Sequence, residues 1–196
     1  ASDKQTCWLT LKKELAAAGV HIVEAATLTA GEHEWLEAEF MRHVFPILTP
    51  INVDPAHPSP FIHNKGLTLA LGMTSAEGRA MNGLIPIPGQ LDRFIRLPDS
   101  GERGSPIRFI RIETVIGLFL SELYPTFTIR AQGAFRVLRD SDIELQEEAE
   151  DLTRAYETQL KRRRRGNVIR LEIEVSMPIG LQKFVIDELE VKDGSV

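Results

Sequence analysis

The chain has 196 residues and a formal net charge of −5 at pH 7, with 43% hydrophobic and 26% charged residues, as expected for one soluble globular domain. The acidic balance argues against whole-molecule attraction to nucleic acid or anionic membranes, and no apolar run approaches the ~18 residues of a membrane span. The single cysteine, Cys7, excludes an internal disulfide and a thiolate metal site, which favours a reducing cytoplasm.

The N-terminal residues predict a helix followed by a short strand. Apolar residues at three- and four-residue spacing favour a helix over residues 6–18, and Gly19 is a typical stop after it. These apolar residues are Trp8, Leu11, Leu15 and Ala18. Residues 20–24 are then predicted to form a strand.

A second helix is predicted to begin at Thr29. The pair Thr29 and Glu32 has the spacing of a capping box, in which each side chain satisfies an exposed backbone amide of the other residue. Pro46 ends this helix. Its apolar stripe is predicted to contain Leu36, Phe40 and Val44, with Trp35 beside them.

Residues 45–60 contain five of the chain's 11 prolines. Proline fixes φ, removes a backbone donor and pushes the preceding residue towards extended conformations, so neither a helix nor a central strand can run through this segment. It also contains several large apolar residues, and we therefore expect a rigid, packed connection rather than a disordered linker.

The centre of the chain predicts strands and turns. Residues 66–73 alternate apolar and small or polar side chains, which predicts a strand with one strongly buried face. Further strands are predicted at 82–87, 93–97 and 107–110, and residues 98–106 are predicted to form an exposed hairpin loop.

The C-terminal part mixes helices and strands. Helices are predicted at 113–123, 145–165 and from Pro178 through Leu189, and strands at 127–129, 135–139 and 168–175. The last strand has the clearest alternation, with Ile169, Leu171, Ile173 and Val175 expected on its buried face. Because no regular strand–helix–strand rhythm is present, the sequence predicts an α+β fold with a mainly antiparallel or mixed sheet and packed helices.

Two sequence words, far apart in the chain, resemble one protein family. The first is Phe45-Pro46-Ile47-Leu48-Thr49-Pro50 followed by Val53-Asp54-Pro55-Ala56-His57-Pro58, and the second is Phe135-Arg136-Val137-Leu138-Arg139 with an acidic helix and Arg170-Leu171-Glu172 after it. Both are similar to segments of bacterial polyphosphate kinases. Leu138 and Ser59 depart from the family's usual residues, which suggests a less common branch.

The resemblance implies a place within a larger enzyme. Polyphosphate kinases have a helical N-terminal domain, a middle or head domain, and two C-terminal domains that contain the phosphorylated histidine and the metal ligands. The matching words belong to the middle domain. We therefore expect residues 1–196 to be this single domain, with an N-terminal helical lead-in over 1–45 and an α+β body over 46–196, cut from a longer polypeptide.

The family resemblance also implies an activity for the parent enzyme, the transfer of the ATP γ-phosphate to inorganic polyphosphate through a phosphohistidine. Mg²⁺ and ATP are its expected cofactors. No catalytic, metal-binding or cofactor-binding residue carries over onto this chain, which is expected to be an inactive, cytoplasmic scaffold. Its expected partners are the remaining domains and a second copy in a homodimer, through residues near Trp8 and the proline-rich connection.

The alternative function is a polyanion-binding module. Lys161, Arg162, Arg163, Arg164 and Arg165 end the predicted long helix, and guanidinium groups bind phosphoryl oxygens in bidentate fashion. Arg136 and Arg139 are candidates to extend this basic surface. However, cations at a helix C-terminus also stabilise the helix dipole without a ligand, and strand arginines are often only the wet face of a sheet.

A histidine-dependent phosphotransferase or hydrolase is the third hypothesis. His57 has Asp54 nearby in sequence, and a carboxylate can orient an imidazole for nucleophilic attack. The simpler interpretation is that Asp54 caps a turn and His57 packs in a stiff loop. The other histidines, His21, His33, His43 and His63, lack metal-ligand spacing and are expected to be incidental.

Overall fold

The computed structural model describes residues 2–53, 62–99, 101, 104–140, 168–189 and 191. The chain divides into two compact units: unit 1 comprises residues 1–48 and 88–125, and unit 2 comprises residues 49–87 and 126–196. Each unit contains one sheet with helices, so the predicted α+β fold with mainly antiparallel sheets is confirmed. Within the described residues, no helix has the length and apolar character needed to cross a membrane.

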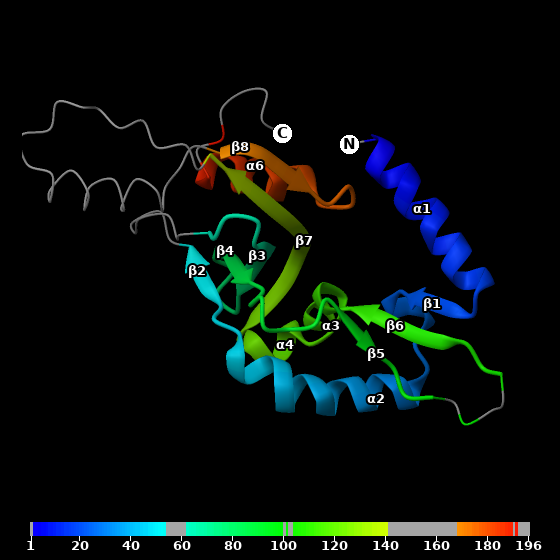
Figure 1. Ribbon diagram of the computed structural model, residues 1–196. Coiled ribbons are helices and arrows are strands. Elements are labelled where there is room, and N and C mark those ends of the chain that lie inside the picture. Colours follow the sequence, from blue (N-terminus) through cyan, green and yellow to red (C-terminus); the bar gives the residue numbers. More distant parts are fainter. Residues whose placement is uncertain are drawn as a thin grey trace, which may run out of the picture. The chain divides into compact units, whose positions relative to one another are not determined.

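Unit 1 is built on a three-stranded sheet of order β1-β6-β5 (Figure 1). Strand β6 pairs parallel to β1 and antiparallel to β5, and the β5–β6 hairpin is the one predicted around residues 98–106. The strands are β1 (Val20–Val23), β5 (Phe94–Arg96) and β6 (Ile107–Arg111). The helices are α1 (Ser2–Ala17), η1 (Ala25–Thr27), α2 (Ala30–Glu39), η2 (Phe40–Val44), η3 (Phe45–Ile47), α3 (Ile112–Leu118) and α4 (Leu120–Leu123).

Helix α2 begins as the sequence predicts. The Glu32 amide donates to Thr29 Oγ1 at 3.2 Å, and the Thr29 amide donates to Glu32 Oε2 at 2.8 Å, which completes the capping box. The helix continues through the π-helical turn η2 before Pro46 ends it. All three members of the predicted stripe are buried in unit 1: Leu36, Phe40 and Val44.

The predicted helix over 113–123 is interrupted. Phe119 leaves the helical region, with φ −113° and ψ 29°, and separates α3 from α4. Its ring lies 5.2 Å from the ring of Phe40 and is 4% exposed. Packing of this aromatic side chain in the core of unit 1 therefore accompanies the break that the continuous apolar pattern did not predict.

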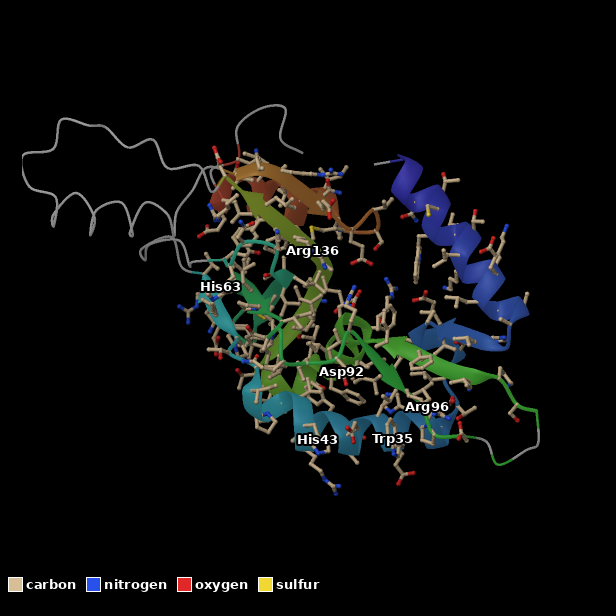
Figure 2. The ribbon with its side chains drawn as sticks, in the orientation of Figure 1. Trp35, His43, His63, Asp92, Arg96 and Arg136 are labelled. Carbon is tan, nitrogen blue, oxygen red and sulfur yellow. The ribbon has the colours of Figure 1, made fainter. Side chains whose placement is uncertain are left out.

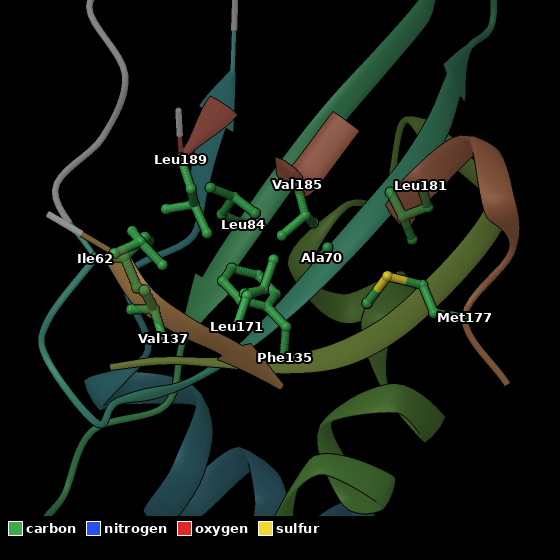
Figure 3. Close-up of a cluster of buried hydrophobic side chains, with 11 residues drawn as sticks. Ile62, Ala70, Leu84, Phe135, Val137, Leu171, Met177, Leu181, Val185 and Leu189 are labelled. Atoms are coloured by element: carbon green, nitrogen blue, oxygen red, sulfur yellow. The ribbon is translucent and has the colours of Figure 1, made fainter. Parts of the chain in front are cut away.

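Unit 2 is a five-stranded antiparallel sheet of order β2-β4-β3-β7-β8. Its elements are β2 (Ile51–Val53), β3 (Leu67–Ser75), β4 (Ala80–Pro86), β7 (Phe127–Arg139), β8 (Val168–Ile173) and α6 (Ile179–Glu188). Helix α6 covers one face of this sheet (Figure 3). The core between them contains Ile62, Ala70, Leu84, Phe135, Val137, Val168, Leu171, Met177, Leu181, Val185 and Leu189.

Two strand predictions need correction. Strand β3 was expected to bury one face, but Thr68 and Ala70 are 1% and 0% exposed, as fully buried as Leu71 on the opposite face. Ala70 lies in the core beneath α6, where a small residue suits the close packing. The predicted strands 127–129 and 135–139 form the single strand β7, because the intervening residues also pair with β3.

The buried face predicted for 168–175 is right for Leu171, which is buried, and for Ile173, which packs against the α6 core, but wrong for Ile169 and Val175. Leu138 pairs with Arg170 and Arg139 with Val168, so Ile169 is an extra residue in β8, as in a β-bulge. The bulge changes the alternation: Val168 and Leu171 are buried, whereas Ile169 is 57% exposed. Val175 lies beyond the strand and is 87% exposed.

Candidate functional site

The candidate site residues that the structure describes, Arg136 and Arg139, both lie on β7. Arg136 is labelled in Figure 2. The two arginines are three residues apart, and side chains alternate along a strand, so they occupy opposite faces of the sheet. The other candidates, Lys161 to Arg165, lie outside the described residues, as do His57 and Asp54. A basic surface that joins Arg136 or Arg139 to Lys161 to Arg165 therefore stays a prediction.

Arg136 is a half-buried cation on the sheet face opposite the α6 core. It pairs with Leu67 of β3 on one side and with Glu172 of β8 on the other. Glu172 is in turn contacted by Arg170, whose Nη2 lies 3.3 Å from Glu172 Oε1. Within the described residues, the buried Nε of Arg136 has no hydrogen-bond partner.

Arg139 is fixed chiefly by its backbone. Its amide donates to Asn64 Oδ1 at 3.0 Å, and its carbonyl accepts from Asn64 Nδ2 at 3.3 Å. The neighbouring Lys65 amide donates to the Val137 carbonyl at 2.8 Å, with Lys65 in the left-handed region at φ 63°. Burial lowers the pKa of the Arg139 guanidinium. These contacts hold the loop before β3 against the end of β7, which indicates a structural role.

Unit 1 contains a cleft of about 880 Å³, located between the C-terminal half of α1, β1, the start of α2 and the β5–β6 loop. Its charged lining residues are paired. Lys12 Nζ lies 2.9 Å from Glu24 Oε1, and Arg108 donates to the Glu32 carboxylate and, at 2.9 Å, to the Thr27 carbonyl. These pairs neutralise the lysine and the arginine, so the cleft offers little attraction to a polyanion.

Two carboxylates of this cleft have pKa values below the ordinary 4.5. Burial alone would raise the pKa of Glu32, but hydrogen bonds from Thr29 and the charge of Arg108 lower it by more. Burial alone would also raise the pKa of Glu24, but the hydrogen bonds and charges of Lys12 and Arg111 have a larger effect and lower it. Both carboxylates are therefore ionised at neutral pH and serve as ion-pair partners.

The ion pairs continue from Glu24 into the body of unit 1. Arg111 of β6 donates to Glu24 Oε2 at 2.9 Å and also lies 3.7 Å from Glu113 Oε1. Glu113, at the start of α3, is buried and accepts two hydrogen bonds from Arg93. A continuous series of alternating charges thus links α1, Glu24 at the end of β1, β6 and α3. The sequence analysis missed it, because its members lie up to 87 residues apart and no local pattern marks them.

The described histidines do not form a reaction centre. His21 lines the unit 1 cleft, and His43 Nδ1 lies 2.8 Å from Glu39 Oε1 on the same helical segment. His33 stacks edge-on against Phe119 at 5.2 Å. His63 lies in the loop before β3 (Figure 2). Within the described part of the chain, no three His, Cys, Asp or Glu residues gather closely enough to hold a metal ion.

Unit 2 has a second cleft, of about 870 Å³, beside the β3–β4 turn and the C-terminal part of α6. Its lining is mixed: Met81, Phe127 and Phe184 are apolar, whereas Arg79 and Glu188 are charged. Glu77 on this turn accepts a hydrogen bond from Ser75 Oγ at 2.8 Å, which lowers its pKa.

Comparison with known proteins identifies a family. A family model described as the polyphosphate kinase middle domain matches residues 31–196. The polyphosphate kinase of Erythrobacter litoralis (strain HTCC2594) is 46% identical over 171 residues, covering 87% of this chain and 23% of that protein. That of Mycobacterium avium (strain 104) is 38% identical over 194 residues, covering 95% and 27% respectively.

The fold is similar to that of a solved structure. The crystal structure of polyphosphate kinase from Porphyromonas gingivalis matches 94% of this chain and 26% of that chain, with a TM-score of 0.73 and 18% sequence identity. Such an identity shows the fold alone. This chain spans about a quarter of the length of the relatives that it matches.

Proposed function

Because this chain belongs to the polyphosphate kinase family and matches its middle domain over residues 31–196, we propose that it is the middle domain of a longer polyphosphate kinase. The parent enzyme transfers the ATP γ-phosphate to inorganic polyphosphate through a phosphohistidine, in the cytoplasm. This domain is a non-catalytic scaffold in that enzyme. It contacts the remaining domains and a second copy of the enzyme.

The observation that best supports the scaffold role is that arginines of unit 1 are ion-paired with carboxylates of the same unit. Arg93, Arg108 and Arg111 each form an ion pair with a carboxylate of another element of unit 1. Phosphoryl transfer depends on cations that are positioned to stabilise phosphate oxygens. Arginines already committed to internal carboxylates stabilise the fold instead.

The arginine-bound carboxylates of unit 1 do not fit a Mg²⁺–ATP site. Mg²⁺ binds through carboxylates with phosphate oxygens and water, and the described carboxylates Glu24, Glu32 and Glu113 are bound to arginines. We therefore assign these three carboxylates no role in the reaction. The nucleotide, the metal ion and the phosphorylated histidine belong to the remaining domains.

The purified chain tests this proposal directly. We expect no acid-insoluble phosphate polymer from ATP and Mg²⁺, and no acid-labile phosphohistidine by mass spectrometry. A longer polyphosphate kinase polypeptide assayed in parallel serves as the positive control. Polymer synthesis that stays with the chain through successive chromatographic steps would contradict the scaffold role.

A second candidate, polyanion binding, is favoured by Arg136. This cation is half-buried on the sheet face opposite the α6 core. If polyphosphate contacts it, Arg136→Gln reduces the slope of log affinity against log salt by about 0.7, the value for one phosphate contact on a flexible strand. Arg79→Gln removes the same charge from the β3–β4 turn and is the matched control. Equal slopes for both variants would exclude Arg136 as a contact.

A further inference from the structure

Asn82 and Gly83 form a chemically labile pair within strand β4. Of the chain's four asparagines, Asn82 is the one that a glycine follows. The backbone nitrogen of the next residue can attack the side-chain amide carbon of an asparagine and expel ammonia. Glycine favours this step because it has no Cβ to hinder the nitrogen and its backbone bends freely. The other asparagines precede larger residues: Asn52 and Asn167 precede valine, and Asn64 precedes lysine.

The same dipeptide is typical of a tight hairpin turn, but here it lies inside a strand. Strand β4 pairs with β2 on one side and with β3, the central strand of the sheet, on the other. Asn82 lies opposite Val53 of β2 and Gly72 of β3, and Gly83 pairs with the neighbouring residues of the same two strands. Pairing on both sides holds the dipeptide in extended backbone, which is not the bent geometry that ring closure needs.

The Gly83 amide is directed at the central strand. Just beyond β4, the Ile87 amide donates to the Leu67 carbonyl at the start of β3, at 2.9 Å. Backbone groups alternate between the two neighbours along a strand, so Gly83, four residues earlier, also faces β3, where Leu71 is its partner. The Asn82 side chain projects out of the plane in which this amide lies. The Gly83 nitrogen therefore reaches the Asn82 amide carbon only after β4 has separated from β3.

Separation of β4 from β3 breaks the core of unit 2. Leu84 follows Gly83 and pairs with Ala70 of β3, and both lie in the core beneath α6, at 2% and 0% exposure. Core strands open only at a free energy close to that of global unfolding. The folded unit therefore suppresses the reaction at Asn82, whereas the unfolded chain has no such protection.

We propose that Asn82 is a spontaneous deamidation site that records unfolding of unit 2. In the unfolded chain, the Gly83 nitrogen bonds to Cγ of Asn82 and gives up its proton. The bond from Cγ to the side-chain nitrogen breaks, and that nitrogen leaves with the proton as ammonia. Water then opens the resulting cyclic imide at either carbonyl, which gives aspartate or isoaspartate at position 82. Each step is a substitution at a carbonyl carbon, so neither an oxidant nor a reductant takes part.

The isoaspartate product does not fit the native sheet. Its backbone runs through the former side chain and so contains one additional methylene group before Gly83. This extra atom shifts Gly83 and Leu84 relative to their partners in β2 and β3, although the buried face fixes the register of these strands. Chains with isoaspartate at position 82 therefore do not regain the native unit 2, and unfolding becomes irreversible for them.

Peptide mapping by mass spectrometry tests the proposal on this chain, kept for equal periods at mildly alkaline pH in native buffer and in guanidinium chloride. We expect loss of ammonia at Asn82 to be at least about tenfold slower in native buffer, since β4 must first separate from β3. In guanidinium chloride, Asn82 reacts faster than Asn52 and Asn64 of the same molecules, which are the internal controls. Gly83→Ala slows the reaction in guanidinium chloride, a comparison that does not depend on how the variant folds.

Refolding tests the consequence for unit 2. After guanidinium chloride is removed from a partly reacted sample, the fraction that elutes as native chain in size-exclusion chromatography is expected to be depleted of isoaspartate at position 82. Equal rates at Asn82 in the two solvents would overturn the protection by β3. A reaction in guanidinium chloride that is no faster at Asn82 than at Asn52, or unchanged by Gly83→Ala, would overturn the site itself. Undiminished isoaspartate in the native fraction would contradict the irreversible step.

Discussion

Arg93 donates one hydrogen bond to each carboxylate oxygen of Glu113, which lies 20 residues later in the chain. The Glu113 side chain is 9% exposed and also has Arg111 at 3.7 Å. A carboxylate in the first turn of a helix is further favoured by the helix dipole. Glu113 thus joins the segment before β5, the end of β6 and the start of α3 through a single buried charge.

Replacement of this carboxylate is expected to destabilise unit 1. Glu113→Gln keeps the shape but leaves Arg93 and Arg111 facing a neutral amide, and we expect a loss of about 1–3 kcal/mol in the free energy of unfolding in urea. The estimate is modest because Arg93 is 40% exposed and water screens its charge. Glu122→Gln, at an exposed position of α4, is the control and should change little. Equal effects of the two substitutions would contradict the role of Glu113.

Gly133 is required by close packing in unit 2. A Cβ atom at this position would lie 2.7 Å from the Cβ and Cγ atoms of Met177, a distance that real Cβ atoms essentially never show. Overpacking of a core costs about 1–3 kcal/mol, and Gly133→Ala should lower the free energy of unfolding by that amount. The cost should shrink in a Met177→Gly background, where the clashing Cβ and Cγ atoms are both removed. A double-mutant cycle measures this, and additive effects of the two substitutions would show that the contact is not the cause.

Local sequence patterns predicted local structure well, but they did not predict how distant segments pair. The capping box of Thr29 and Glu32 and the stripe through Phe40 were confirmed, because both depend on neighbours within one or two helical turns. The face of β8 was predicted correctly at Leu171 but not at Ile169, because the bulge at Ile169 is set by pairing with β7, which strict alternation cannot anticipate. Of the candidate site, the strand that contains Arg136 and Arg139 was predicted, and alternation along it places the two side chains on opposite faces.

The bulge in β8 allows a matched pair of substitutions at two positions of the same strand, Ile169 and Leu171. Leu171 is 3% exposed in the core beneath α6, whereas Ile169 is 57% exposed. Leu171→Ala should lower the free energy of unfolding by about 3 kcal/mol, from lost burial and a residual cavity. Ile169→Ala should stay within about 0.5 kcal/mol of the parent, as exposed positions usually do. Strict alternation predicts similar losses at both positions, so similar losses would argue against the bulge.

Stability in acid should depend on Glu32. Its pKa in the folded chain lies below the ordinary 4.5, although burial opposes the shift, because Thr29 and Arg108 bind its ionised form. The stabilisation is therefore present above pH 4.5 and is lost as the pH falls towards the lower folded value. Melting temperatures between neutral and strongly acidic pH should show a smaller acid-induced drop for Glu32→Gln than for the parent. Glu34→Gln, at an exposed neighbouring position, should keep the parent's profile.

Stability in alkali should depend on Tyr124, at the C-terminal end of α4. Burial raises the pKa of this phenol from 10.0 to about 12. The unfolded chain therefore releases the Tyr124 proton first, so the stabilisation is complete below pH 10 and is lost as the pH rises towards 12. Tyr124→Phe removes the ionisable group and should flatten this part of the stability profile, measured by urea unfolding at successive alkaline pH values. The phenol absorbance of the folded parent should show one tyrosine that titrates above the ordinary range and disappears in Tyr124→Phe. An unchanged alkaline profile in the variant would assign the loss of stability to other groups.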